Sequence, residues 1–138
     1  MIRRLEVTDY PALHRLQQRA YQVEADLIGV SDFPPLQQTP AQLVHEQPSG
    51  YVYCLEEQLV GALTIEQETI TRLVVAPDYF RQGIAKHLLR HALAKHRLHF
   101  VSTAASNLPA IALYQQFGFR QIDQVSRDAV VVVSLKRE

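Results

Sequence analysis

Cysteine and long apolar runs are both scarce in this sequence of 138 residues. Cys54 is the only cysteine, so the chain has no internal disulfide. It lies in the apolar run of residues 51–55, where we expect a buried strand residue, with a reactive thiol as the alternative. No apolar stretch approaches the length of a membrane span, and the opening M-I-R-R-L-E lacks the hydrophobic region of a signal peptide. These absences predict a cytoplasmic protein without membrane contact.

An excess of either charge is absent too. Lys plus Arg number 14 and Asp plus Glu number 14, so the formal net charge is +0. Without a basic excess to neutralise phosphates, nucleic acid is not expected as a partner. The length fits one domain over residues 1–138, which buries roughly two-thirds of its unfolded surface. A small phosphorylated ligand needs only a local cation cluster and stays compatible with this balance.

The most informative segment spans residues 73–89 and reads L-V-V-A-P-D-Y-F-R-Q-G-I-A-K-H-L-L. It combines an apolar strand, a tight turn and a glycine loop that opens directly into an amphipathic helix. Backbone N–H groups at a helix start lack intrahelical acceptors, and the helix dipole adds partial positive charge there. A phosphate at this point is held by the main chain. Gly83 allows a close approach of the ligand, and Arg81 and Lys86 add formal charge.

A second segment, residues 107–119, reads N-L-P-A-I-A-L-Y-Q-Q-F-G-F. Together the two segments resemble the GNAT superfamily of N-acetyltransferases, whose acetyl-CoA loop has the pattern Q/R-x-x-G-x-G/A, here at residues 80–85. Phe80 departs from the Gln or Arg of the pattern, which a loop that works mainly through backbone N–H groups tolerates. The similarity is nearest to bacterial enzymes that acetylate the N-terminus of a ribosomal protein, which share a D-Y-x-R-Q-G-x-x turn and an A-I-A-L-Y helix.

The resemblance implies an acetyl-CoA site and direct acetyl transfer to a primary amine of a small molecule or a peptide. It assigns cofactor binding to Leu73, Val74, Val75, Arg81, Gln82, Gly83, Ile84, Ala85, Lys86 and Asn107. The strand at residues 73–75 is expected to open away from its neighbour and to offer backbone groups to the pantetheine arm, one N–H acting as the oxyanion donor. No metal is implied, and a homodimer is compatible with the family.

Tyr114 is the candidate general acid. It lies seven residues after Asn107, about two turns along the same helix, so both side chains can face the ligand. A neutral hydroxyl near a thioester sulfur can protonate the departing thiolate. The alternative is that the ring only packs against the sheet with Ala110, Ile111 and Phe117. Asn107 can serve both as a helix N-cap and as a hydrogen-bond partner of the cofactor.

The general base is not identified by the sequence. By resemblance, family members that use a carboxylate carry it at the positions of Thr69 or Ser102. Glu68 neighbours the first position, but strand alternation points its side chain to the opposite face. Two alternatives stay open: Glu24 on the first helix, which could equally be a solvated helix carboxylate, or an ordered water that relays the proton. The missing carboxylates also keep open a catalytically silent acetyl-CoA-binding sensor or interaction module.

The spacing of apolar residues predicts a mixed α/β chain. We expect strands over residues 2–7, 51–55, 59–66, 68–75, 98–103, 119–125 and 129–135, and helices over residues 8–27, 40–46, 82–96 and 107–117. This order resembles the GNAT fold, a mainly antiparallel sheet of about seven strands with four helices on both faces. Thr8 is predicted to cap the first helix, with Leu13, Leu16, Ala20 and Val23 on its apolar face.

Two further features have open interpretations. Residues 32–36, D-F-P-P-L, lie by resemblance over the acceptor pocket, and a rigid connector is the other interpretation. His87 and His91 have a spacing that could bind a metal, but no third ligand is evident, so we expect a solvated helix face there.

Overall fold

The computed structural model describes residues 1–127 and 130–138. The strands are β1 (Ile2–Arg4), β2 (Ser49–Leu55), β3 (Gln58–Glu66), β4 (Thr69–Val75), β5 (Phe100–Ala104), β6 (Arg120–Arg127) and β7 (Val130–Lys136); the helices are α1 (Tyr10–Ile28), α2 (Pro40–Glu46), α3 (Ile84–Lys95) and α4 (Leu108–Gln116). Short 3-10 helices cover Val7–Asp9, Pro34–Gln37 and Pro77–Tyr79. The predicted order of elements is confirmed, although Ala129, the predicted start of the last strand, lies outside the described residues. None of the helices in these ranges is long and apolar enough to span a bilayer.

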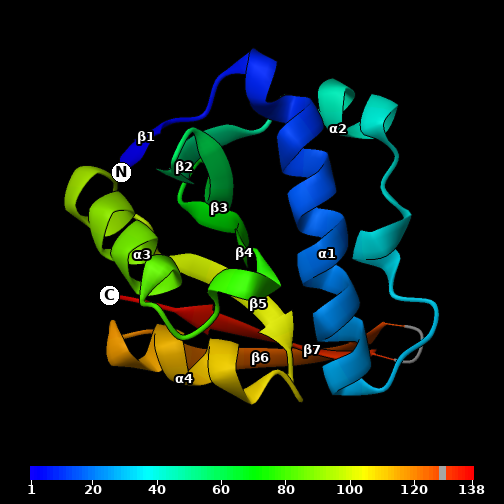
Figure 1. The fold of residues 1–138 in the computed structure, drawn as a ribbon. Helices are drawn as coiled ribbons and strands as arrows, with labels where there is room; N and C mark the ends of the chain where they lie inside the picture. Colours follow the sequence, from blue (N-terminus) through cyan, green and yellow to red (C-terminus); the bar gives the residue numbers. More distant parts are fainter. Residues whose placement is uncertain (128–129) are drawn as a thin grey trace.

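The strands form one sheet in the order β1-β2-β3-β4-β5-β7-β6. Every neighbouring pair is antiparallel except β4 and β5, which are parallel. Figure 1 shows α1 and α2 on one side of the central strands, α3 on the other side, and α4 beside β6 and β7. The mixed, mainly antiparallel sheet with helices on both faces is therefore confirmed.

The core forms where the apolar faces of the helices pack against the sheet. On α3, the buried residues are Ile84, Leu88, Leu89 and Ala92, as their helical spacing predicts. Leu13 and Leu16 of α1 are buried as expected, but Val23 is exposed. Near its C-terminal end α1 turns Ala25 inward against Phe33, because a loop covers the helix there. The apolar face of α1 therefore shifts along its length.

Several further local predictions differ from the structure, and the first strand ends at Arg4 instead of residue 7. Thr8 does not cap α1: it lies in a 3-10 turn, and Asp9 is the N-cap, held by a hydrogen bond from the Glu6 N–H at 2.8 Å and by Arg3. Helix α3 begins at Ile84 instead of Gln82, because Gly83 has a left-handed φ of 79° that cannot continue a helix. Cys54 is only partly buried, at the point where the register of β2 shifts.

Candidate active site

The loop before α3 presents a row of backbone amides to the outside. Arg81 and Gly83 both have left-handed φ values, 65° and 79°, which fold the chain sharply after the Pro77–Tyr79 turn. In α3, the first backbone N–H group with a backbone acceptor is that of His87, which donates to the Gly83 carbonyl at 2.9 Å. Among the described residues, none of the backbone N–H groups of residues 81–86 donates a hydrogen bond to a backbone carbonyl in a loop or helix cap. The segment is therefore a fit for an anionic group.

The predicted cofactor-binding residues of this loop differ in exposure, and Ala85 is partly buried. Arg81, Gln82, Gly83 and Lys86 are exposed, so their side chains and amides can be reached by a ligand. Ile84 is 3% exposed and packs in the core, so it can offer only its backbone. A Cβ added to Gly83 would meet no protein atom within 4 Å. The glycine is thus needed for its backbone conformation and leaves open space in front of the loop.

Strands β4 and β5 separate soon after they meet. They pair only at Thr69 with Phe100 and at Ile70 with Val101, whereas β4 continues to Val75 along β3. An extra residue at Thr71 shifts the β3–β4 register, as in a β-bulge. Alternate residues of the segment 71–75 therefore turn their N–H and C=O groups toward the gap and not toward β3. The predicted residues Leu73, Val74 and Val75 lie on this segment.

A cavity of about 330 Å³ occupies the region between the separated strands and α1. Residues of β4 and β5 form its floor, and α1, α4 and the loop after α1 form its walls. The polar side chains that line it include Tyr21, Glu24, Arg72, Asn107 and Tyr114. Segments far apart in the sequence thus meet at one hollow, as expected for a ligand site.

Tyr114 is 5% exposed and its ring meets the Phe119 ring edge-on, with the centroids 5.7 Å apart. Its side chain lines the cavity. Burial raises the pKa of Tyr114 well above its usual range, and the nearby charge of Glu24 adds to the shift. The phenol therefore stays protonated at neutral pH. Both predicted roles, packing and proton donation, are compatible with this position.

Asn107 caps α4 by accepting a hydrogen bond from the Ala110 N–H at 3.3 Å. Its side chain also lines the cavity, beside Glu24. The helix cap thus places an amide group at the ligand site.

Glu24 is partly buried in the wall of the cavity and is not the solvated helix carboxylate that was one reading of the sequence. Burial raises the pKa of Glu24, and a side-chain hydrogen bond from Asn107 opposes the shift. Its neighbour Ala25 is 1% exposed, which fixes the orientation of this turn of α1.

The two positions at which the resemblance to the family offered a carboxylate, Thr69 and Ser102, hold hydroxyl groups. Ser102 of β5 is exposed, and its Oγ lies 3.1 Å from the Ser134 Oγ of β7. Thr69 is partly buried at the start of β4. Glu68 is exposed, and its carboxylate lies 3.6 Å from the Nε2 atom of His99. None of these side chains supplies a carboxylate to the cavity.

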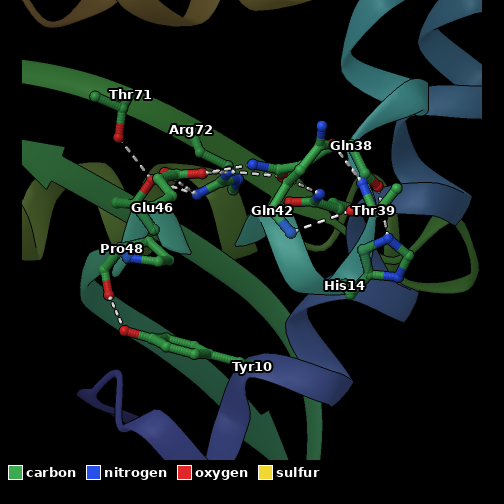
Figure 2. A network of polar contacts seen from close by, with 11 residues as sticks. Tyr10, His14, Gln38, Thr39, Gln42, Glu46, Pro48, Thr71 and Arg72 are labelled. Atoms are coloured by element: carbon green, nitrogen blue, oxygen red, sulfur yellow. Dashed lines mark hydrogen bonds and ion pairs between the residues drawn. The ribbon is translucent and has the colours of Figure 1, made fainter. Parts of the chain in front are cut away.

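Arg72 was missed by sequence reasoning. This residue of β4 is 9% exposed, and its Nη2 atom donates to Glu46 Oε1 of α2 at 2.9 Å. Its other bonds reach Glu46 Oε2 at 3.2 Å, Thr64 Oγ1 at 3.1 Å and Gln38 Oε1 at 3.4 Å. Figure 2 shows Arg72 pointing toward Glu46 and Gln38, so the network ties α2 and the loop before it to β4. A charged residue within an apolar strand is the signal that could have identified it.

The loop after α1 closes one wall of the cavity. Phe33 is 5% exposed and meets the Tyr21 ring edge-on at 6.1 Å, and Pro34 and Pro35 line the cavity beside it. Gln38 at the end of the loop is held by Gln17, whose Nε2 donates to Gln38 Oε1 at 2.7 Å. The segment is packed against α1 and lines the hollow.

His87 and His91 lie beside tyrosines of β2. His87 is exposed, as predicted for a solvated helix face, whereas His91 is partly buried. His87 stacks on Tyr53 with the centroids 6.3 Å apart, and His91 meets Tyr51 edge-on at 4.7 Å. Within residues 1–127 and 130–138, no three His, Cys, Asp or Glu side chains gather in a way that could hold a metal.

Comparison with known proteins gives the class. The profile of the acetyltransferase (GNAT) family matches residues 10–119. The [ribosomal protein bS18]-alanine N-acetyltransferase of Escherichia coli (strain K12) is 30% identical over 126 residues, which cover 85% of this chain and 78% of that enzyme. Peptidyl-lysine N-acetyltransferase YjaB of Salmonella typhimurium is 28% identical over 109 residues, 79% of this chain and 68% of that enzyme. The chain is therefore an acyl-CoA N-acyltransferase, and it belongs to the GNAT family.

A third relative, YqkA of Bacillus subtilis, is 35% identical over 84% of this chain. The chain spans only 36% of the length of YqkA. Among solved structures, the E. coli bS18-alanine N-acetyltransferase superposes with a TM-score of 0.76 at 23% identity, covering 99% of this chain and 92% of the other. A Thermoplasma acidophilum PaiA N-acetyltransferase in complex with coenzyme A gives 0.71 at 18% identity, covering 99% and 98%. These likenesses show the fold.

Proposed function

We propose that this chain moves the acetyl group of acetyl-CoA directly to a primary amine. The observation that carries the proposal is the cavity lined by Tyr114, which lies along β4 where the pairing with β5 stops. The end of β4 leads into the exposed amides before α3, so an anion site and a reaction cavity follow one another along the chain. Acetyl-CoA at this position supplies an activated thioester whose acetyl carbon an amine can attack.

The loop would hold the pyrophosphate of the substrate. Amides of residues 81–86 point outward without backbone acceptors, and the side chains of Arg81 and Lys86 are exposed beside them. Their positive charges complement the charge of a pyrophosphate, and the α3 dipole adds to them. Leu73, Val74 and Val75 would bind the pantetheine arm through the backbone groups that face the gap, one N–H stabilising the thioester oxygen.

Tyr114 would donate the proton that the CoA sulfur needs. The raised pKa keeps its hydroxyl protonated, and its side chain lines the cavity. A buried donor of this kind can transfer a proton when a thiolate forms beside it. Asn107 would hydrogen-bond the same substrate while capping α4.

The acceptor would enter from the side of α1 and the loop after it. Phe33, Pro34 and Pro35 line the cavity there, so the acceptor would contact an apolar wall. Relatives named for N-terminal alanine and for peptidyl lysine suggest two peptide probes. A catalytically silent module has no support from relatives that are named as transferases.

The proposal is tested with acetyl-CoA and three acceptors: a peptide with a free N-terminal alanine, an N-terminally blocked peptide with one lysine, and butylamine. Thiol release and the mass of the acetylated acceptor are measured together. We expect at least one acceptor to be acetylated in step with thiol release. Binding of acetyl-CoA without transfer to any amine would support the silent module instead.

A further inference from the structure

Glu24 is the carboxylate that lines the cavity. Of the described residues that line the hollow, it is the only Asp or Glu. Tyr114 and Asn107 line the same hollow from α4, so acid and carboxylate lie on opposite helices around one space. The hydroxyls at Thr69 and Ser102 cannot replace a carboxylate as a proton acceptor, because their protonated forms are strong acids.

We infer that Glu24 is the general base, which accepts the proton of the acceptor amine in this cavity. The inference rests on the proposed acetyl transfer. That reaction needs a proton acceptor, and β4 and β5 supply no carboxylate to the cavity. The base would then act from α1, across the cavity from the separated strands.

The other titratable groups around Glu24 do not compete for this role. Tyr21 precedes it on α1, and burial raises the pKa of Tyr21, so its phenol stays protonated. Arg72 on β4 and Arg127 on β6 are cations that cannot accept a proton. Tyr114 on α4 is itself a protonated phenol, and Glu46 of α2 is engaged by Arg72. Glu24 is therefore the one acceptor among these groups.

The environment of Glu24 increases the basicity of its carboxylate. Burial raises the pKa of the carboxyl group toward that of an amine, which lowers the cost of the proton transfer. The Asn107 side chain, which lines the same hollow, acts on this pKa in the opposite direction.

The proton balance follows from these positions. Glu24 takes one proton from the acceptor ammonium, and the neutral amine nitrogen forms a bond to the acetyl carbon. The bond between that carbon and the CoA sulfur breaks, and the sulfur takes the Tyr114 proton. The second proton lost by the nitrogen restores Tyr114, and Glu24 releases its proton to water. One amide, one thiol and one released proton result.

The test is the pH dependence of kcat/KM for the fastest acceptor of the three above, at saturating acetyl-CoA, in wild type, Glu24→Gln and Asp26→Asn. Asp26 lies on the same helix but is exposed and bonded to Gln22, so it is the matched control. We expect Glu24→Gln to lower kcat/KM about 100-fold at neutral pH. The deficit should shrink at alkaline pH, where the acceptor amine is already neutral.

The wild type and Asp26→Asn should share an acidic limb set by the Glu24 carboxyl group, whereas in Glu24→Gln the rate should follow only the deprotonation of the acceptor amine. An unchanged profile in Glu24→Gln assigns the proton to a water relay and overturns the inference. A uniform loss at every pH makes Glu24 a residue that only binds the acceptor, which also overturns it. If the wild type acetylates none of the amines although acetyl-CoA binds, the proposed function itself fails, and the base assignment fails with it.

Discussion

Glu24 of α1 and Tyr114 of α4 line one cavity, and the negative charge of Glu24 disfavours ionisation of the Tyr114 phenol. Burial is the main cause of the raised pKa of Tyr114, and Glu24 adds to it. Burial likewise raises the pKa of Glu24. The two groups thus have environments that favour a protonated acid and a carboxylate with increased basicity, the pairing that acetyl transfer to an amine needs.

Removing the hydroxyl of Tyr114 should slow the transfer without disturbing the fold. Tyr114→Phe keeps the ring that packs on Phe119, so Tm and the Kd for acetyl-CoA should stay close to wild type. Turnover should fall roughly ten- to a thousand-fold, the range expected for a lost proton donor. Steady-state kinetics with the chosen acceptor measure this. Unchanged turnover would leave Tyr114 as a packing residue.

Neutralising Glu24 should stabilise the protein slightly at neutral pH. A carboxyl group whose pKa is raised by folding binds its proton more tightly in the native state. The stability that this gives is fully present below the unfolded pKa of about 4.3 and is lost as the pH rises through the folded pKa. Glu24→Gln imitates the protonated form, so its Tm should exceed that of wild type at pH 7.5 and match it near pH 4.

Thermal unfolding of wild type, Glu24→Gln and Asp26→Asn across this pH range measures the effect. A Tm of Glu24→Gln below that of wild type at pH 7.5 would show that the carboxylate holds the structure together. Loss of activity would then have a structural cause.

The ion pair of Arg72 and Glu46 should contribute stability with the opposite pH dependence. Burial acts to raise the pKa of Glu46, but hydrogen bonds from Arg72 and Gln38 outweigh it and hold the pKa below its usual value. The stability is therefore present above the unfolded pKa of about 4.3 and is lost as the pH falls through the folded pKa. Glu46→Gln should cost about 1–3 kcal/mol at pH 7, since Arg72 stays buried while the partly exposed Glu46 is screened by solvent.

Urea unfolding at pH 7 and at pH 4 measures this cost. Glu66→Gln is the control, because Glu66 is exposed at the end of β3 and forms no ion pair among the described residues. Equal stability of Glu46→Gln and Glu66→Gln at pH 7 would mean that the pair contributes nothing net.

Much of the fold could be predicted from the sequence, because its local signals agree with one another. The Thr39–Pro40 start of α2 and the apolar spacing of α3 each point to the element that forms. The surroundings of Glu24 could not be predicted, since they depend on how α1 packs beside α4, which no local pattern encodes. The ion pair of Arg72 could not be predicted for the same reason, because its partner Glu46 lies on another element.

The most direct measurement of the central claim is calorimetric titration of acetyl-CoA into wild type, Gly83→Val and Gly29→Val. Gly83 and Gly29 have similar left-handed φ values, 79° and 75°, and an added Cβ meets no protein atom within 4 Å at either position. Both variants should therefore lose a similar stability, about 1–2 kcal/mol. Only Gly83→Val places its side chain in front of the amides of residues 81–86.

Wild type and Gly29→Val should bind acetyl-CoA with similar Kd, and Gly83→Val should bind it at least about tenfold more weakly, a loss of about 1.4 kcal/mol. Acetyl-CoA should raise the Tm of wild type and Gly29→Val by similar amounts and that of Gly83→Val by less. Absence of both heat and thermal shift in wild type at millimolar acetyl-CoA, or equal binding by Gly83→Val and Gly29→Val, would contradict the assignment of the loop before α3 as the site for this substrate.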